Sequence, residues 1–282
     1  MEDAASSTRA TIACAGLARE GVAGAAGGFM NPVPNAVAGL IEALRAGTVR
    51  LIDLTHGLDE HSPYWPEGRD QSSFSAKVAS TYESHECFAR DVTMSEHSGT
   101  HLDAPGHVIP GGATVDQLPV SGFLNPACVV DVRDAVATDP DYRVTVVDLE
   151  GFIEANGPLP RGCFVFFHTG WASRWPSQKQ FINEDAEGVK HFPGISLEAA
   201  RFLLAEVHPV GVGIDTLSIE YGRTEHLAVH RFVLGAGLYI LENVANLELL
   251  PATGALVIAL PLKLLGGSGS PARVLAWVPN QP

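Results

Sequence analysis

The stretch His-Ser-Gly-Thr-His-Leu-Asp-Ala-Pro-Gly-His, residues 97–107, concentrates three histidines and one aspartate in a single short segment. Imidazole nitrogen and carboxylate oxygen suit Zn²⁺, Mn²⁺ or Fe²⁺, and a segment without cysteine argues against an iron–sulfur or thiolate site. Any one of these histidines alone would more simply be a surface residue or a satisfied core residue. Four candidate ligands in one run favour a metal site instead.

The spacing of these residues predicts how the segment folds. His97, His101 and Asp103 share parity, so an extended strand would place them on one face. In a straight strand the two histidine Cα atoms would lie roughly 13 Å apart, the limit that two imidazoles can bridge. We therefore expect a bend at Gly99, and a turn at Pro105-Gly106 that brings His107 back over the site. One regular helix fits less well, since Asp103 would point away from the histidines.

The same segment resembles the signature His-x-Gly-Thr-His-x-Asp-x-Pro-x-His of the metal-dependent cyclase family, which includes bacterial kynurenine formamidases and isatin hydrolases. The resemblance extends over about residues 48–280, and its further segments are Asp53–Thr55, Pro63–Pro66, His168–Trp171, His191–Ser196, Leu241–Val244, Ala259–Lys263 and Gly267–Arg273. It implies an α/β protein with a mixed sheet core and a swivelling β/β/α architecture.

The resemblance also implies roles for individual residues. The first ion would be bound by His97, His101 and Asp103, and His107 would act in catalysis. A second metal position would be completed by His230 and Glu242. Mn²⁺ is the preferred ion and Zn²⁺ the alternative, because the ligands suit both, and the choice between one and two ions stays open.

The segment Gly213–Gly222 distinguishes branches within the family. It resembles the isatin-hydrolase branch more than the kynurenine-formamidase branch, where an Asp-Pro pair is usual. The predicted activity is therefore hydrolysis of a cyclic amide by metal-activated water, as in the conversion of isatin to isatinate. An arylformamidase acting on N-formylkynurenine is the first alternative. A catalytically silent metal-binding or ligand-binding protein is the second.

Aromatic residues are candidates to cover a flat aromatic amide, because such rings stack on aromatic side chains. The candidates are Trp65, Phe88 and Trp171. Trp65 is preferred, because the other two are expected to be core residues. A serine hydrolase is disfavoured, since Gly267-Ser268-Gly269-Ser270 lacks the Gly-x-Ser-x-Gly order.

Composition narrows the class of partner. The chain has 282 residues, 46% of them hydrophobic, enough for one large domain with a sizeable core. A formal net charge of −14 without a cluster of Lys and Arg disfavours nucleic acid and anionic membranes as partners, and favours a small molecule. The four cysteines form no Cys-x-x-Cys pair, so neither a disulfide framework nor a thiolate site is indicated.

The N-terminal region is expected to lie outside the catalytic domain. Residues 1–29 are rich in Ala and Gly, which predicts a disordered arm or a true start at Met30. Apolar residues at helical spacing predict a helix at Asn35–Ala46, within a segment 30–47 that would pack on a partner subunit. We expect a homo-oligomer, either a dimer or a tetramer, with residues 48–282 as one catalytic domain. Neither a secretory signal nor a membrane span is recognisable, so a cytoplasmic enzyme is expected.

Short apolar runs predict the strands of the core. They are Val49–Leu54, Ala127–Val132, Cys163–Phe167, Val210–Ile214, Leu238–Leu241, Leu256–Leu260 and Val274–Val278. A polar loop after Val132 should lead to a helix that begins with the capping box Thr145–Asp148, and Ser196 should cap a helix to Val207. Acidic residues close several strands, where α/β folds present chemistry. For Asp53 and Asp215 a structural role is as well supported as a functional one.

Overall fold

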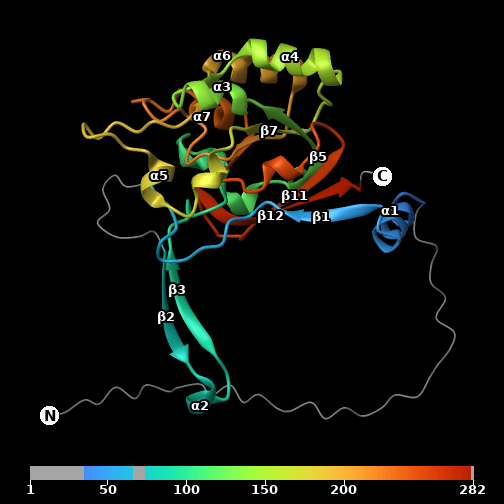
Figure 1. The fold of residues 1–282 in the computed structure, drawn as a ribbon. Coiled ribbons are helices and arrows are strands. Elements are labelled where there is room, and N and C mark those ends of the chain that lie inside the picture. Colours follow the sequence, from blue (N-terminus) through green and yellow to red (C-terminus); the bar gives the residue numbers. More distant parts are fainter. Residues whose placement is uncertain (1–34, 66–73, 281–282) are drawn as a thin grey trace. The chain divides into compact units, whose positions relative to one another are not determined.

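The computed structural model describes residues 35–65 and 74–280 (Figure 1). The predicted arm, residues 1–29, lies outside the described residues. Helix α1 (Asn35–Ala46) has the bounds predicted for it, which confirms that element. Its packing on a partner subunit stays a prediction.

The core is a mixed sheet that closes on itself. Its strands are β1 (Val49–Asp53), β4 (His101–Asp103), β5 (Leu124–Asp131), β7 (Phe164–His168), β9 (Gly211–Ile214), β10 (Tyr239–Glu242), β11 (Ala255–Pro261) and β12 (Gly269–Pro279). The strand order is β1-β12-β11-β5-β7-β9-β10-β4, and β4 also pairs with β12. Among the described residues, seven strands therefore form a barrel, and β1 pairs with the C-terminal half of β12, whose first residues pair with β4. The predicted mixed α/β core is confirmed, whereas closure of the sheet was not predicted.

The barrel interior is filled by alternate side chains of the strands. Phe164 and Phe166 of β7 point inward and are fully buried. Strand β9 makes room for them with Gly211 and Gly213, since a Cβ at Gly213 would lie 2.5 Å from the Phe166 ring. The predicted strand Cys163–Phe167 is therefore buried on both faces, because Val165 and Phe167 face the helices.

Helices cover the outer face of the parallel strands β5, β7, β9 and β10 (Figure 1). They are α3 (Arg133–Thr138), α4 (Val146–Asn156), α6 (Leu197–Phe202) with the π-helical turn Leu203–Val207, and α7 (Ala228–Gly235). The predicted capping box is present, because the Thr145 hydroxyl accepts from the Asp148 N–H and Asp148 accepts from the Thr145 N–H. Ser196 caps α6 as predicted. The loop predicted after Val132 is wrong in part, since buried Val136 anchors α3 there.

Two small sheets lie outside the barrel. One pairs β2 (Phe74–Ser80) with β3 (Ala89–Met94) around α2 (Tyr82–His85), and the other pairs β6 (Arg143–Val144) with β8 (Gly194–Ile195). The remaining helix is α5 (Gln178–Ile182), and single 3₁₀ turns occur at Pro105–His107, Val115–Gln117, Val120–Phe123, Trp171–Arg174 and Leu247–Leu249. The hairpin β2–β3 was not predicted. Over the residues described, no helix has the length and apolar character needed to cross a bilayer.

Candidate metal centre

Strand β4 presents the central residues of the site. Leu102 points into the barrel, so His101 and Asp103 lie on the opposite face and are both buried. In the antiparallel pairing of β4 with β10, His101 lies directly opposite Glu242. Register thus brings together two residues that are far apart in the sequence.

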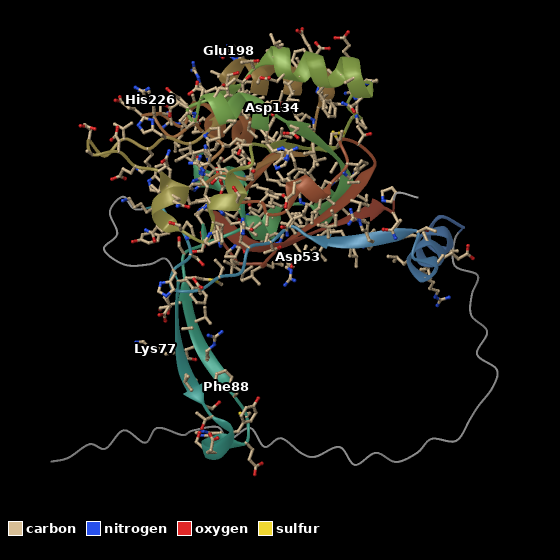
Figure 2. The ribbon with its side chains drawn as sticks, in the orientation of Figure 1. Asp53, Lys77, Phe88, Asp134, Glu198 and His226 are labelled. Atoms are coloured by element: carbon tan, nitrogen blue, oxygen red, sulfur yellow. The ribbon has the colours of Figure 1, made fainter. Side chains whose placement is uncertain are left out.

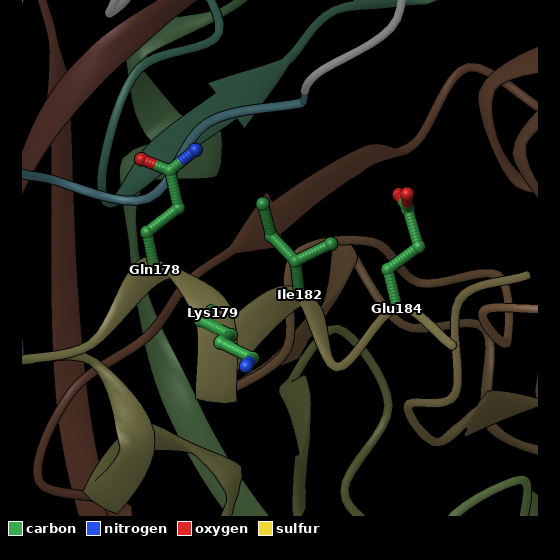
Figure 3. Close-up of a pocket in the computed structure, with 4 residues that line it drawn as sticks. All are labelled: Gln178, Lys179, Ile182 and Glu184. Atoms are coloured by element: carbon green, nitrogen blue, oxygen red, sulfur yellow. The ribbon is translucent and has the colours of Figure 1, made fainter. Parts of the chain in front are cut away.

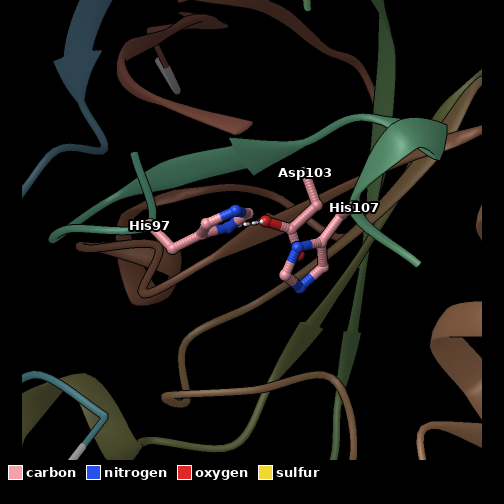
Figure 4. A group of neighbouring side chains, drawn as sticks. All are labelled: His97, Asp103 and His107. Atoms are coloured by element: carbon pink, nitrogen blue, oxygen red, sulfur yellow. Dashed lines mark hydrogen bonds and ion pairs between the residues drawn. The ribbon is translucent and has the colours of Figure 1, made fainter. Parts of the chain in front are cut away.

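The bend predicted at Gly99 is present, because this glycine has φ +61°, and it brings His97 beside Asp103. The His97 Nδ1 atom lies 2.6 Å from Asp103 Oδ1 (Figure 4). On the other side of the ring, Nε2 lies 3.0 Å from Ser268 Oγ, whose hydroxyl donates to Glu96. Seating the ring requires Gly269, since a Cβ there would lie 2.5 Å from His97 Cε1.

The second predicted turn is also present. The 3₁₀ turn Pro105–His107 returns the chain so that the His107 and His97 ring centroids lie 4.1 Å apart. Figure 4 shows both imidazoles beside the Asp103 carboxylate. Burial lowers the pKa of His107, so its ring is neutral at physiological pH and able to accept a proton.

Two further residues reach Asp103 from other elements. His230 of α7 places Nε2 3.5 Å from Asp103 Oδ2 and 3.1 Å from Glu242 Oε1. His101 Nε2 lies 3.3 Å from Asp103 Oδ1 and 3.5 Å from Glu242 Oε2. We call His101, Asp103, His230 and Glu242 the deep group, because all four are buried.

The charges of the deep group are strongly coupled. Burial lowers the pKa of His101, but the neighbouring carboxylates of Asp103 and Glu242 outweigh it and raise the pKa to about 9. Burial opposes a charge on Asp103 too, yet His101 and the other histidines hold its pKa well below the usual range. Protons on histidine therefore neutralise these carboxylates, and a bound cation would take over that function.

The arrangement of donors fits a divalent ion. Ligand atoms lie within 4.8 Å of one another in two sets, His97–Asp103–His107 and His101–Asp103–Glu242. Asp103 belongs to both, and its buried Oδ2 has no hydrogen-bond partner among the described residues. A divalent cation bound among these histidine and carboxylate donors would satisfy that oxygen. The sets differ from the sequence grouping, since His107 lies with His97, while His101 lies with Glu242.

The structure separates the three predicted substrate-binding aromatics. Trp65 is 38% exposed, with its ring edge against Phe192 and the Lys190 ammonium 4.9 Å from its centroid. Trp171 is core, since its ring is buried and its indole N–H donates to the Phe181 carbonyl. Phe88 lies on the hairpin between α2 and β3, where it stacks on Tyr82 (Figure 2). Among the described residues the ring contacts of His97, His101, His107 and His230 are with one another and include neither Trp171 nor Phe88.

The two acidic residues left open at strand ends have structural partners. Asp53 pairs with Arg273, whose guanidinium donates to both carboxylate oxygens at 3.0 and 2.6 Å. Asp215 Oδ1 accepts from the backbone N–H and the hydroxyl of Thr169, while its Oδ2 has no hydrogen-bond partner among the described residues and no cluster of histidines is recorded around it there. Both contacts join neighbouring segments of the core and leave the metal site to the other carboxylates.

A separate hollow of about 410 Å³ lies beside α5 (Figure 3). Its described lining residues are Gln178, Lys179, Ile182 and Glu184. None of them belongs to the histidine cluster, so this hollow supplies no ligand to the metal site.

Comparison with known proteins identifies relatives of this chain. Residues 52–221 match the family model described as "Putative cyclase". An isatin hydrolase from Roseibium aggregatum is 32% identical over 87% of this chain and 98% of its own length. A kynurenine formamidase from Salinibacter ruber is 27% identical over 80% of this chain and 96% of its own length.

A solved structure shows the same fold. The crystal structure of an isatin hydrolase bound to the product analogue thioisatinate superposes with a TM-score of 0.81 and is 30% identical, covering 87% of this chain and 98% of that one. The similarity therefore covers most of this chain and nearly all of the isatin hydrolase.

Proposed function

This chain belongs to the cyclase family, and we propose that it is a metal-dependent hydrolase that opens the ring of a cyclic aryl amide, as in isatin to isatinate. The observation that carries the proposal is Asp103, a buried carboxylate whose Oδ2 accepts no hydrogen bond among the described residues, enclosed by His97, His107 and the rest of the deep group. Similarity to isatin hydrolases over nearly the full catalytic region supports the substrate class. Family membership likewise supports the swivelling β/β/α architecture.

The residues that would hold a divalent ion are His97, His101 and Asp103, and a second ion would use His230 and Glu242 with Asp103 common to both, so the deep group contributes ligands to each. Such an ion, Mn²⁺ in preference to Zn²⁺, supplies a lowered pKa for water and polarisation of the substrate carbonyl. The ligand types suit either metal, because imidazole and carboxylate bind both.

His107 is the proposed acid–base residue. Its neutral ring takes the proton of the attacking water and then gives it to the amide nitrogen as the C–N bond breaks. Water addition to isatin gives one carboxylate and one neutral aryl amine on the same molecule, and the remaining proton of the water is released to solvent. Trp65 is the aromatic candidate for contact with the substrate ring, since it is the one of the three predicted aromatics with an exposed face outside the hairpin.

Hydrolysis of N-formylkynurenine is the second candidate, because kynurenine formamidases are also relatives of this chain. Turnover of isatin and of N-formylkynurenine by the purified, Mn²⁺-loaded protein separates the two. We expect the larger kcat/KM on isatin. Preference for the formamide would favour the second candidate, and hydrolysis of neither, with metal fully bound, would favour a silent binding protein.

We also propose that the protein forms a homo-oligomer. An isolated two-stranded hairpin is marginal in water, yet β2–β3 exposes Val78, Val92 and Met94. A second copy of the chain would cover these side chains. Molar mass by light scattering tests this, and a monomer at micromolar concentration would contradict it.

A further inference from the structure

Glu220 is a buried carboxylate that sequence reasoning did not assign to the site. It lies in the loop after β9 and is 4% exposed. Its Oε1 atom accepts from the backbone N–H groups of Val229 at 2.7 Å and His230 at 3.1 Å, in the first turn of α7. The same oxygen lies 3.4 Å from His230 Nδ1. One oxygen thus contacts both the backbone and the ring of His230.

This contact determines which ring nitrogen of His230 faces the deep group. A proton on Nδ1 directed at Glu220 leaves the Nε2 lone pair free on the opposite side of the ring. Nε2 is the atom that lies 3.1 Å from Glu242 Oε1 and 3.5 Å from Asp103 Oδ2. A carboxylate behind a metal-binding histidine fixes its tautomer and raises its basicity.

The residue before Glu220 holds the other ligand. The backbone N–H of Ile219 donates to Glu242 Oε1 at 2.7 Å. The segment is itself fixed, because the Ile195 N–H donates to the Ile219 carbonyl at 3.0 Å, and a Cβ at Gly194 would collide with the backbone of Glu220 and Tyr221. Two consecutive residues therefore hold His230 and Glu242 in place.

We propose that Glu220 is a positioning residue for the metal centre, which acts through His230 to raise the affinity of the deep group for a divalent cation. This inference depends on the proposed function, since it presumes that the deep group binds a cation. The two can fail separately, because Glu220 forms no hydrogen bond or ion pair with the side chain of Asp103 or Glu242 among the described residues.

The variant Glu220→Gln separates the negative charge of Glu220 from its hydrogen bonds with the first turn of α7. An amide oxygen can still accept from the backbone N–H groups of α7, whereas the negative charge behind His230 is lost. We expect Mn²⁺ and Zn²⁺, measured by competition with a chromophoric chelator, to bind about 10- to 100-fold more weakly to this variant. Circular dichroism of the metal-free protein should be unchanged.

The matched control is Glu198→Gln, which removes an exposed carboxylate from the first turn of α6 (Figure 2). Its metal affinity should equal that of the wild type. If Glu220→Gln also binds metal as the wild type does, Glu220 merely caps a helix and the proposal is overturned. A wild-type protein that binds neither ion would instead overturn the proposed function.

A second measurement needs no variant. In the Zn²⁺-loaded wild type labelled with ¹⁵N-histidine, NMR should show the His230 proton on Nδ1 and the metal on Nε2. The opposite tautomer would overturn the proposal even if Glu220→Gln failed to fold.

Discussion

Metal affinity should fall steeply as pH decreases from about 9 to about 7. In the metal-free protein His101 has a pKa raised to about 9, so at pH 7 only about one molecule in a hundred has the ring deprotonated. A cation binds the neutral ring and must displace that proton. His101 alone therefore predicts roughly tenfold weaker binding per pH unit below 9.

The groups around His101 set the rest of the pH dependence of metal affinity. Burial lowers the pKa of His230, but the nearby carboxylates of Asp103, Glu220 and Glu242 raise it well above the usual range, so a second proton adds to the dependence. Asp103 adds none, since its pKa is held well below the usual range. His107 adds none either, because burial lowers its pKa, and His107→Ala should keep the same slope.

Titration calorimetry in buffers of different ionisation enthalpy counts the protons released. We expect between one and two per ion bound by the deep group at about pH 7. Affinity that is flat from pH 7 to pH 9, with no proton release, would refute the claim that a cation replaces the protons of this cluster.

Three other perturbations test separate parts of the structure. His107→Ala should keep bound metal while kcat falls about 10²- to 10⁴-fold, and metal loss in elemental analysis would make His107 a ligand instead. Burial lowers the pKa of His56 to about 4, so as the pH decreases below about 6.5 the unfolded chain takes up a proton before the folded one does. The free energy of unfolding therefore decreases as the pH decreases. His56→Phe keeps a ring against Trp175 but cannot protonate, so denaturant unfolding should show it losing about 2 kcal/mol less than wild type between pH 7.5 and about pH 5. Equal losses would contradict this. Gly269→Ala forces a methyl against His97 and should cost about 1–3 kcal/mol in unfolding free energy and weaken metal binding, whereas Gly151→Ala, in open space on α4, should stabilise the helix.

Local patterns predicted much of the fold because the parallel strands β7, β9 and β10 are buried on both faces and read as continuous apolar runs. The bend at Gly99 and the return at Pro105 followed from bond lengths and strand rise alone. Barrel closure did not follow, because the pairing of β4 with β12 depends on register over a long stretch of chain. The hairpin β2–β3 was missed although its sequence carried a signal, since Phe74, Ala76 and Val78 alternate with polar residues in β2.

The contacts that hold His230 and Glu242 in place could not be predicted from the sequence either. Glu220 and the backbone N–H of Ile219 become relevant only when α7 and β10 are placed beside each other. Trp171 was a substrate candidate because sequence does not tell a buried indole from an exposed one, and its bond to Phe181 shows it to be core. The segment Gly213–Gly222, which resembles isatin hydrolases, did contain Glu220. Its acidic side chain was the signal that could have pointed to it.

The most direct test is the metal content of the purified wild type and of Asp103→Ala, measured by elemental analysis together with turnover of isatin. We expect one or two equivalents of Mn²⁺ or Zn²⁺ and ring opening in the wild type, and loss of both in the variant. An Asp103→Ala protein that keeps its metal and its full activity would refute the assignment of this cluster as a catalytic metal centre.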